Sequence, residues 1–148
     1  MARIKIDMPE KYIFSTDLDV RISDINYGNH VGNDSILSIV HESRCRFFAS
    51  LGFSELDVEG FGIIMTDSAI VYKSESHYGE TLTINISTQD HNKYGCDIIY
   101  QITEKESKRV VAEVKTGIVF FDYAQKKVVN TPQPFLDKVK ETAQNLAS

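Results

Sequence analysis

One segment constrains the fold more than any other part of the chain: the run SILSIVHESRCRFFASLG at residues 35–52. Set out on a helix, its large apolar side chains cover most of the circumference; they are Ile36, Leu37, Ile39, Val40, Phe47, Phe48 and Leu51. A helix that is apolar nearly all round is typically buried rather than laid on a surface. The rest of the chain must therefore enclose this helix.

Both ends of the segment carry helix-boundary signals. Asn33 and Asp34 are both good N-caps, because their side-chain oxygens accept hydrogen bonds from the free N–H groups of the first turn. At the other end, Gly52 followed by apolar Phe53 is typical of the glycine just past a last helical turn. We therefore predict a helix from Asn33 or Asp34 to Leu51.

Strand patterns dominate the remainder of the chain. Apolar and polar side chains alternate between residues 14 and 22, which predicts a half-buried strand. Turns are predicted at NKYG (92–95), EKESKR and FDYAQKK, and further strands within residues 63–73, 81–87, 96–103 and 110–121. An amphipathic helix is predicted after Pro134, with its apolar positions at Phe135, Val139, Ala143 and Leu146.

The order of these elements indicates the fold class. Because no helix separates the later strands, they predict an antiparallel sheet, with about four strands in meander after the long helix. The predicted class is α+β, an antiparallel sheet wrapped around one long central helix, in a single domain spanning residues 1–148. A single sheet covers only one side of a helix. We therefore expect a second copy of the chain, in a homodimer or a dimer of dimers.

The composition argues against several kinds of partner. The formal net charge is −5, whereas nucleic acids and anionic membranes are bound by basic surfaces. No stretch approaches the roughly 18 apolar residues of a membrane span, and the N-terminal MARIKIDMPEK lacks the apolar core of a signal peptide. The two cysteines, Cys45 and Cys96, are expected to be reduced thiols in a cytoplasmic protein.

The residues before the long helix, DINYGNHVGND at 24–34, concentrate hydrogen-bonding side chains. They fit a D-x-[DN]-x-x-x-H-V-x-N loop that opens a helix carrying an E-[AS]-R element. This combination resembles the hotdog-fold thioesterases, in the 4-hydroxybenzoyl-CoA thioesterase-like and acyl-CoA thioesterase branch. Downstream, AIVYKSESHYGETLTI is similar to the next two strands of that family, joined through Gly79 and Glu80. The matching loop and helix residues are Asp24, Asn26, His30, Val31, Asn33, Glu42, Ser43 and Arg44.

The resemblance implies a sheet wrapped around a central helix and a dimer with active sites at the subunit interface. It also implies hydrolysis of an acyl thioester carried on coenzyme A (acyl-CoA) or on acyl carrier protein (acyl-ACP), with no metal and no cofactor. Two alternatives stay open. One is a non-catalytic acyl-thioester binder, and the other is a hotdog hydratase or dehydratase that uses His30 with Glu42.

A loop at the start of a helix suits thioester chemistry. The free N–H groups and positive dipole end of a helix N-terminus polarise a carbonyl. Gly28 and Gly32 let the backbone bend toward a substrate. Many members of the family carry a catalytic Asp where this chain has Asn26. A carboxamide cannot act as a base at neutral pH, but it can orient water or a carbonyl.

The base must then be another group, and the candidates are Glu42, Asp24, His30 and Asp34. We favour Glu42, because it lies on a small or polar stripe where burial would make a carboxylate more basic. That stripe consists of Asp34, Ser38, Glu42, Cys45 and Ala49. His30 would hold the loop or transfer protons. The candidate substrate contacts are Tyr27, Asn33 and Asp34.

Each of these roles has a purely structural alternative. Asp24 can form an Asx-turn, Asn33 or Asp34 can cap the helix, Glu42 can pair with Arg44 or Arg46, and Tyr27 can serve in packing alone. The run HESRC at 41–45 resembles the zinc signature H-E-x-x-H. Its fifth residue is Cys45 and no third ligand is evident, so His41 is predicted to be an ordinary helix residue.

Overall fold

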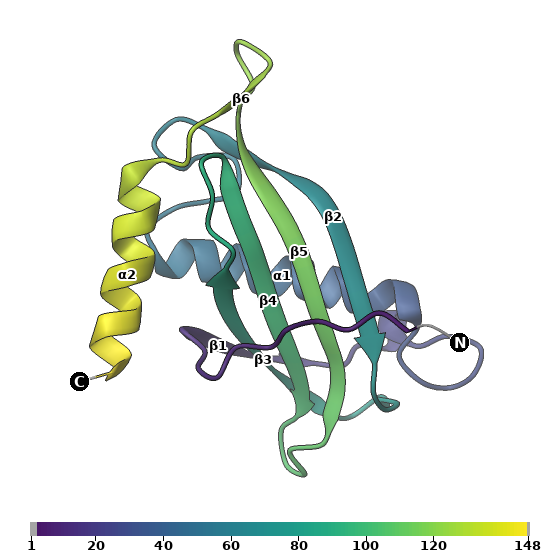
Figure 1. The fold of residues 1–148 in the computed structure, drawn as a ribbon. Helices are drawn as coiled ribbons and strands as arrows, with labels where there is room; N and C mark the ends of the chain where they lie inside the picture. The colour runs from purple at the N-terminus through teal and green to yellow at the C-terminus, as the bar shows by residue number, and fades with distance from the viewer. Residues whose placement is uncertain (1–2, 148) are drawn as a thin grey trace.

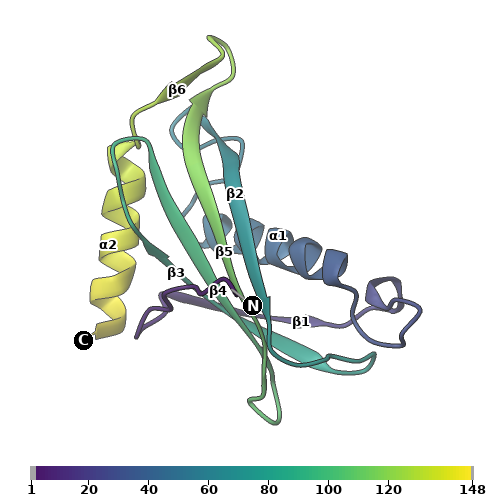
Figure 2. The same cartoon turned by 45° about the vertical axis from the view of Figure 1, so that its right-hand side comes forward.

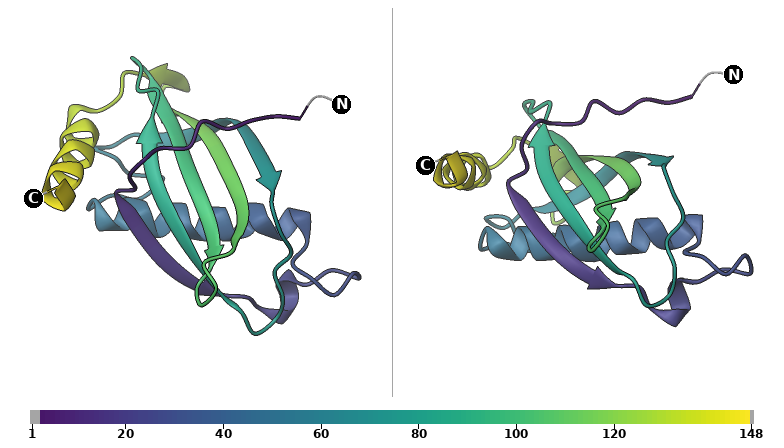
Figure 3. Two further views of the ribbon diagram at one scale, coloured as in Figure 1. Left: turned by 60° about the horizontal axis from the view of Figure 1, so that its bottom comes forward. Right: turned by 90° about the horizontal axis from the view of Figure 1, so that it is seen from below.

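In the computed structural model, which describes residues 3–147, an antiparallel sheet curves around one long helix (Figure 1). That helix is α1 (Asn33–Ser50), and a second helix, α2 (Gln133–Ala147), follows the last strand. The view from below in Figure 3 shows the sheet curling over α1. The predicted α+β class and the sheet wrapped around a long helix are confirmed. The strands are β1 (Phe14–Asp19), β2 (Gly62–Tyr72), β3 (Thr81–Gln89), β4 (Gly95–Glu104), β5 (Val110–Asp122) and β6 (Lys127–Val129).

The strand order is β1-β3-β4-β5-β2, with β6 paired to the end of β5. Strands β3, β4 and β5 form the predicted meander. The prediction of four strands in meander is wrong for β2, which pairs with β5 at the far edge of the sheet. An 18-residue helix is about 27 Å long, and five strands span roughly 19 Å. Helix α1 can therefore carry the chain across the whole sheet, so β1 and β2 lie at opposite edges.

The core lies between the concave face of the sheet and one side of α1. Alternation along β3 turns Leu82, Ile84 and Ile86 inward, where all three are fully buried. On α1 the buried positions recur every three or four residues, as on any amphipathic helix. They are Ile36, Ile39, Val40, Ser43, Arg44, Phe47 and Phe48.

A chain of aromatic contacts attaches α2 to this core. The Phe48 ring lies 5.7 Å from Phe135 of α2, which in turn lies 5.1 Å from Phe120 of β5. Figure 2 shows α2 beside the sheet, next to β3. Of the four apolar positions predicted for α2, Phe135 and Val139 are buried, whereas Ala143 and Leu146 are exposed.

The outward side of α1 is open to solvent in this chain. The prediction of a helix buried nearly all round is therefore wrong for a single copy, because one layer of sheet covers one side. Leu37, predicted as core, is 42% exposed. The predicted polar stripe lies on this open side, which is made of Asn33, Asp34, Leu37, Ser38, His41, Glu42, Cys45, Arg46, Ala49 and Ser50.

The two ends of α1 differ in how well the sequence predicted them. Gly32 is the N-cap residue, and no side chain among residues 3–147 caps the helix. The N-cap prediction for Asn33 and Asp34 is therefore wrong: both lie within the first turn. The predicted C-terminal stop is confirmed. Gly52 has φ +86°, and the Phe53 N–H donates to the Phe48 carbonyl at 2.9 Å, which is the glycine-dependent closure of a helix end.

The first strand is shorter than its sequence pattern suggests. Strand β1 ends at Asp19, and the chain then turns into a short 3-10 helix at Ile22–Asp24. Ile22 continues the apolar parity of the strand, but it is 69% exposed because it lies on this turn. Neither helix in the described part of the chain combines the length and apolarity needed to cross a lipid bilayer.

The packing of α1 gives a first prediction. Phe47 is fully buried and its ring lies 5.7 Å from Phe14 of β1. Phe47→Ala should lower the free energy of unfolding by about 3–5 kcal/mol, because it leaves a cavity between helix and sheet. Leu56→Ala is the control, since Leu56 is 75% exposed; its effect should stay within about 0.5 kcal/mol. Urea denaturation measures both, and equal effects would contradict this packing.

Candidate active site

The loop before α1 is shaped by its own polar groups. An isolated bridge joins Ile25 to Val31, and the Asn26 N–H donates to the His30 carbonyl at 2.9 Å. The Asn26 side-chain oxygen accepts the Gly28 N–H at 2.9 Å, which is an Asx-turn. Asn29 adopts φ +69°, a conformation that asparagine tolerates better than most residues. Asn26 therefore uses its acceptor oxygen to hold the turn.

Asp24 is also occupied by local contacts. Its carboxylate is buried and accepts the Arg21 N–H at 2.8 Å and the Arg21 guanidinium at 3.1 Å. The Asp24 carbonyl accepts the Gly32 N–H at 2.9 Å, which ties the start of the loop to the start of α1. Asp24 thus closes the 3-10 helix, and the Asx-turn proposed for it is formed by Asn26 instead.

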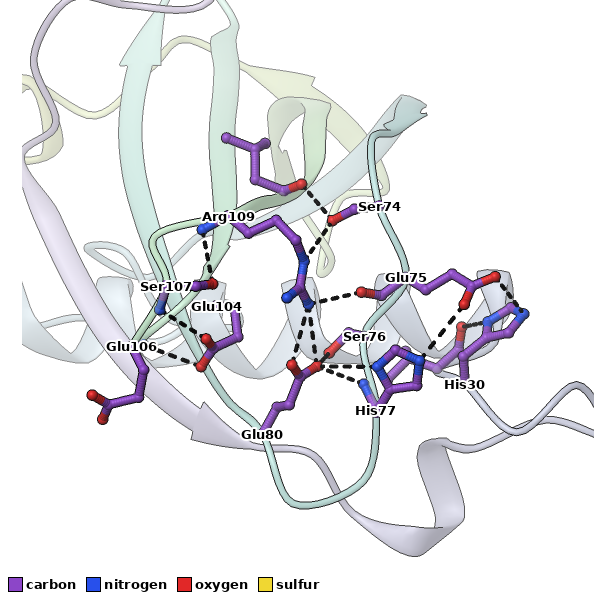
Figure 4. A network of polar contacts seen from close by, with 12 residues as sticks. His30, Ser74, Glu75, Ser76, His77, Glu80, Glu104, Glu106, Ser107 and Arg109 are labelled. Atoms are coloured by element: carbon purple, nitrogen blue, oxygen red, sulfur yellow. Dashed lines mark hydrogen bonds and ion pairs between the residues drawn. The ribbon is translucent and has the colours of Figure 1, made fainter.

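His30 is oriented by its own loop and by the connection between β2 and β3, residues 73–80. Its Nδ1 lies 3.1 Å from the Val31 carbonyl; because a carbonyl can only accept, Nδ1 carries the proton in this contact. The opposite ring nitrogen, Nε2, lies 3.8 Å from a Glu75 carboxylate oxygen. The Val31 N–H donates to the Ser76 carbonyl at 2.8 Å. The 73–80 connection, which lies beside His30 in Figure 4, therefore also holds the loop backbone.

The 73–80 connection is itself fixed by an ion pair between Glu80 and Arg109. The Glu80 carboxylate accepts the His77 N–H at 2.7 Å, the Ser76 hydroxyl at 3.0 Å and the Arg109 guanidinium at 3.2 Å (Figure 4). Burial of the carboxyl opposes its ionisation, but these donors outweigh burial and lower the pKa of Glu80 below its ordinary value. Arg109 also donates to the Glu75 carbonyl at 2.8 Å.

The N-terminus of α1 opens on a cleft of about 320 Å³. Among residues 3–147, no acceptor is hydrogen-bonded to the N–H of Asn33 or Asp34. Two donors at the positive end of α1 are therefore free to bind an oxygen atom. The Tyr72 hydroxyl donates to the Asn33 carbonyl at 3.3 Å and closes one wall. The lining residues include His30, Asn33, Ile36, Tyr72, Lys73 and Glu75.

A second cleft, of about 390 Å³, runs along the open side of α1. Glu42 lines it with Asp24, Ser38, His41, Cys45 and Arg46. The expected burial of Glu42 is not found in a single chain, where its side chain is 54% exposed and accepts Arg46 Nε at 3.0 Å. This is the pairing with Arg46 that the sequence left open. Glu42 lines this cleft, and its Oε1 accepts no hydrogen bond from the described residues.

The predicted site residues are thus divided between two clefts. His30 and Asn33 lie at the N-terminus of α1, whereas Glu42 and Asp24 lie in the second cleft. Glu42 is nine residues beyond Asn33, roughly 13 Å along the helix axis. Tyr27 is fully exposed and packs against nothing in the described chain. A single chain does not bring the His30 and Glu42 of the hydratase alternative together.

Three residues were not predicted from the sequence as part of this site: Glu75 and Tyr72 line the first cleft, and Arg109 donates to the Glu75 carbonyl. Glu80 carried part of the family likeness, beside Gly79, and its link to Arg109 explains how that position supports the loop. Glu75 lies in an irregular connection and Arg109 follows a turn, so neither belongs to a periodic pattern. Pairing of strands far apart in the sequence places them near His30.

Comparisons with solved structures define the class of this fold. A 1,4-dihydroxy-2-naphthoyl-CoA thioesterase from Synechocystis is 21% identical with a TM-score of 0.79, covering 86% of this chain and 96% of that one. A DHNA-CoA thioesterase from Staphylococcus aureus is 18% identical with a TM-score of 0.77, covering 90% and 91%. A hypothetical protein from the same organism, in complex with CoA, is 16% identical with a TM-score of 0.80, covering 95% and 89%. The class is the hotdog fold.

The family follows from the sequence match. The model of the Thioesterase-like superfamily matches residues 20–139, and the chain belongs to that superfamily. The match includes the loop, α1 and the sheet strands β2 to β5. The resemblance found in the sequence is confirmed. A comparison with curated proteins gives no match.

The Glu80 contacts give a second prediction. Glu80→Gln should lower the free energy of unfolding at pH 7 by about 1–3 kcal/mol, because a charged acceptor of several hydrogen bonds is lost. Since the folded-state pKa of Glu80 lies below 4.5, this stability is present above that pH and disappears as the carboxylate is protonated at lower pH. Urea denaturation at pH 7 and pH 3 should therefore give a difference from wild type that shrinks in acid. A loss of equal size at both pH values, or a similar loss in the exposed control Glu59→Gln, would contradict the ion-pair explanation.

Proposed function

We propose that this protein is a thioesterase that hydrolyses an acyl-CoA to a free acid and coenzyme A, acting as one domain. The single observation that carries the proposal is the pair of N–H groups on Asn33 and Asp34 at the start of α1, which have no hydrogen-bond acceptor among residues 3–147, next to a cleft that Asn33 lines. Membership of the Thioesterase-like superfamily supports the reaction class. The CoA in the Staphylococcus aureus neighbour supports coenzyme A over acyl-ACP as carrier.

In the proposed mechanism the thioester carbonyl oxygen binds to the N–H groups of Asn33 and Asp34. These donors stabilise the negative charge that develops when water attacks the carbonyl carbon. A base takes the proton from the water, the C–S bond breaks, and the thiolate leaves with the proton returned to sulfur. Asn26 retains its amide N–H groups for orienting water, because its oxygen is engaged by Gly28.

We assign the base to Glu42, acting across a subunit interface. Within one chain the carboxylate is too far from the start of α1 to reach the same carbonyl, whereas a second copy placed on the open side of α1 can bring the two together. The exposed Leu37 supports such an interface, as does the outer edge of β2, which pairs with no other strand in the described part of the chain. His30, held by Val31 and Glu75, positions the loop and is the alternative base.

The activity is tested by thiol release from a panel of aromatic, short-chain and long-chain acyl-CoAs. Glu42→Gln should lower kcat by about 10²–10⁴-fold on the best substrate, as expected for loss of a general base. Glu141→Gln is a matched control: Glu141 is an exposed helical glutamate paired with Lys138, as Glu42 is paired with Arg46. Full activity in Glu42→Gln with loss in His30→Ala would move the base to His30.

A non-catalytic acyl-thioester binder is the second candidate function. The observation that favours it is Asn26, whose oxygen is committed to an Asx-turn at the position where many relatives carry a catalytic acid. A wild type silent across the whole panel, with turnover appearing in Asn26→Asp, would establish the binder and reject the thioesterase. Tight binding of an acyl-CoA without turnover would point the same way.

The proposed dimer gives a further prediction. Leu37→Glu places a charge on the open side of α1, where it would be buried by a second copy. Sedimentation should give twice the mass of the chain for wild type and the mass of one chain for this variant. The far-UV circular dichroism of the two proteins should be the same. Leu56→Glu, an equally apolar but loop-borne exposed position, should remain dimeric. A wild-type monomer, or a Leu37→Glu dimer, would exclude this interface.

A further inference from the structure

A cluster of metal-ligating side chains lies on the open side of α1, away from the helix N-terminus. His41 and Cys45 project from adjacent turns, and Glu55 joins them from the loop after the helix. The ligand atoms of these three residues all lie within 4.8 Å of one another. Imidazole, thiolate and carboxylate are the ligand types that bind zinc in proteins. We call these three residues the His41 cluster.

The local fold explains why the three residues meet. Residues four apart lie on the same face of a helix, so His41 and Cys45 are neighbours. The glycine-dependent stop at Gly52 reverses the chain, and the Ile63 N–H donates to the Glu55 carbonyl at 2.9 Å, which fixes that loop. The sequence resembled a zinc signature at 41–45 but showed no third ligand; Glu55, ten residues beyond Cys45, supplies that ligand position.

The Glu55 carboxylate is already oriented toward the cluster. Buried Arg44 donates from Nε to Glu55 Oε1 and from Nη1 to the Tyr100 hydroxyl, at 3.2 Å. The other oxygen, Oε2, therefore faces His41 and lies 3.1 Å from its Nε2. A carboxylate whose second oxygen is held by a neighbouring donor is the usual arrangement around protein metal sites, because that donor fixes the ligand's direction.

The distances fit a small divalent ion. Zinc bonds of about 2.0–2.3 Å at tetrahedral angles place neighbouring donor atoms about 3.3–3.8 Å apart. The His41–Glu55 contact of 3.1 Å is close to this range, and the widest separation in the cluster is at most 4.8 Å. The widest separation exceeds the zinc range by about 1 Å. Rotation of the exposed His41 and Cys45 side chains is enough to remove this excess.

We propose that His41, Cys45 and Glu55 bind a divalent transition-metal ion of the zinc class, with a fourth position open to water or to a ligand. All three residues belong to one chain, so the site is complete without a second copy. The cluster lies beside the proposed base, because Glu42 lines the same cleft as His41 and Cys45; the proposed hydrolysis itself uses no metal.

Charge and protonation set the conditions for binding. Partial burial of the thiol and the nearby Glu55 carboxylate raise the pKa of Cys45 above its ordinary value, although the Arg44 cation opposes this. The thiolate is the form that binds a metal ion, so binding displaces the thiol proton. Glu42 adds a second carboxylate near the thiol and partly offsets the Arg44 charge.

Cobalt(II) titration of the reduced, metal-free full-length protein tests the site. Co²⁺ bound to a thiolate gives a charge-transfer absorption band, which should rise to one ion per chain and be abolished by competing Zn²⁺. Cys45→Ser should remove the band, and His41→Ala should weaken binding about tenfold or more. The control His91→Ala changes an exposed histidine outside the cluster and should bind as wild type does.

The remaining thiol provides an internal check. Cys96 is 2% exposed, so a band that persists in Cys45→Ser would come from another ligand set and overturn the proposal, as would the absence of a band in wild type. Because Glu55→Gln also disturbs the contact with buried Arg44, the two exposed positions carry the test. Zn²⁺ should raise the Tm of wild type and leave that of Cys45→Ser unchanged; equal shifts in both would reject the site.

Discussion

The packing of one side of α1 against the concave face of the sheet is the contact on which the rest of the structure depends. It buries Phe47, Phe48 and the inward residues of β3, and it places β1 and β2 at opposite sheet edges. A single layer of sheet covers only one side of a helix. The same packing therefore leaves the other side of α1 open, and that open side carries both Glu42 and the His41 cluster.

The conformation of the polar loop before α1 is set largely by its own hydrogen bonds. The Asn26 side chain accepts a hydrogen bond from the Gly28 N–H, and the Asp24 side chain accepts one from Arg21. The polar residues of the loop therefore mainly hold its backbone in place. What they leave free are the first N–H groups of α1, because Gly32 has no side chain to cap the helix. The connection anchored by Glu80 and Arg109 also holds the loop, because its Ser76 carbonyl accepts the Val31 N–H. A fixed loop with unused donors is a suitable place to stabilise a developing oxyanion.

Much of the fold was predictable from the sequence, whereas the grouping of the site residues was not. Strand alternation, the Gly52 stop and the long helix are local patterns, and the structure contains all three. Two predictions failed where contacts between distant segments decide the path of the chain. Strand β2 pairs with β5, and Ile22 leaves the first strand for a 3-10 turn. The N-cap was misassigned because Asn33 and Asp34 are chemically good caps, and only the backbone conformation shows that Gly32 takes that place. The sequence named Glu42 and His30 as site candidates, but it could not show that they line different clefts.

The sequence by itself determined the elements, the α+β class and the family, because periodicity, capping signals and the D-x-N and E-S-R elements are properties of neighbouring residues. Only the tertiary structure decided which residues meet. Glu55 reaches His41, Glu75 reaches His30, and Arg109 reaches Glu80 through contacts between segments that are far apart along the chain. Such contacts depend on strand order and on the path of α1 across the sheet. Those features minimise the exposed apolar surface of the whole chain, and no local pattern encodes them.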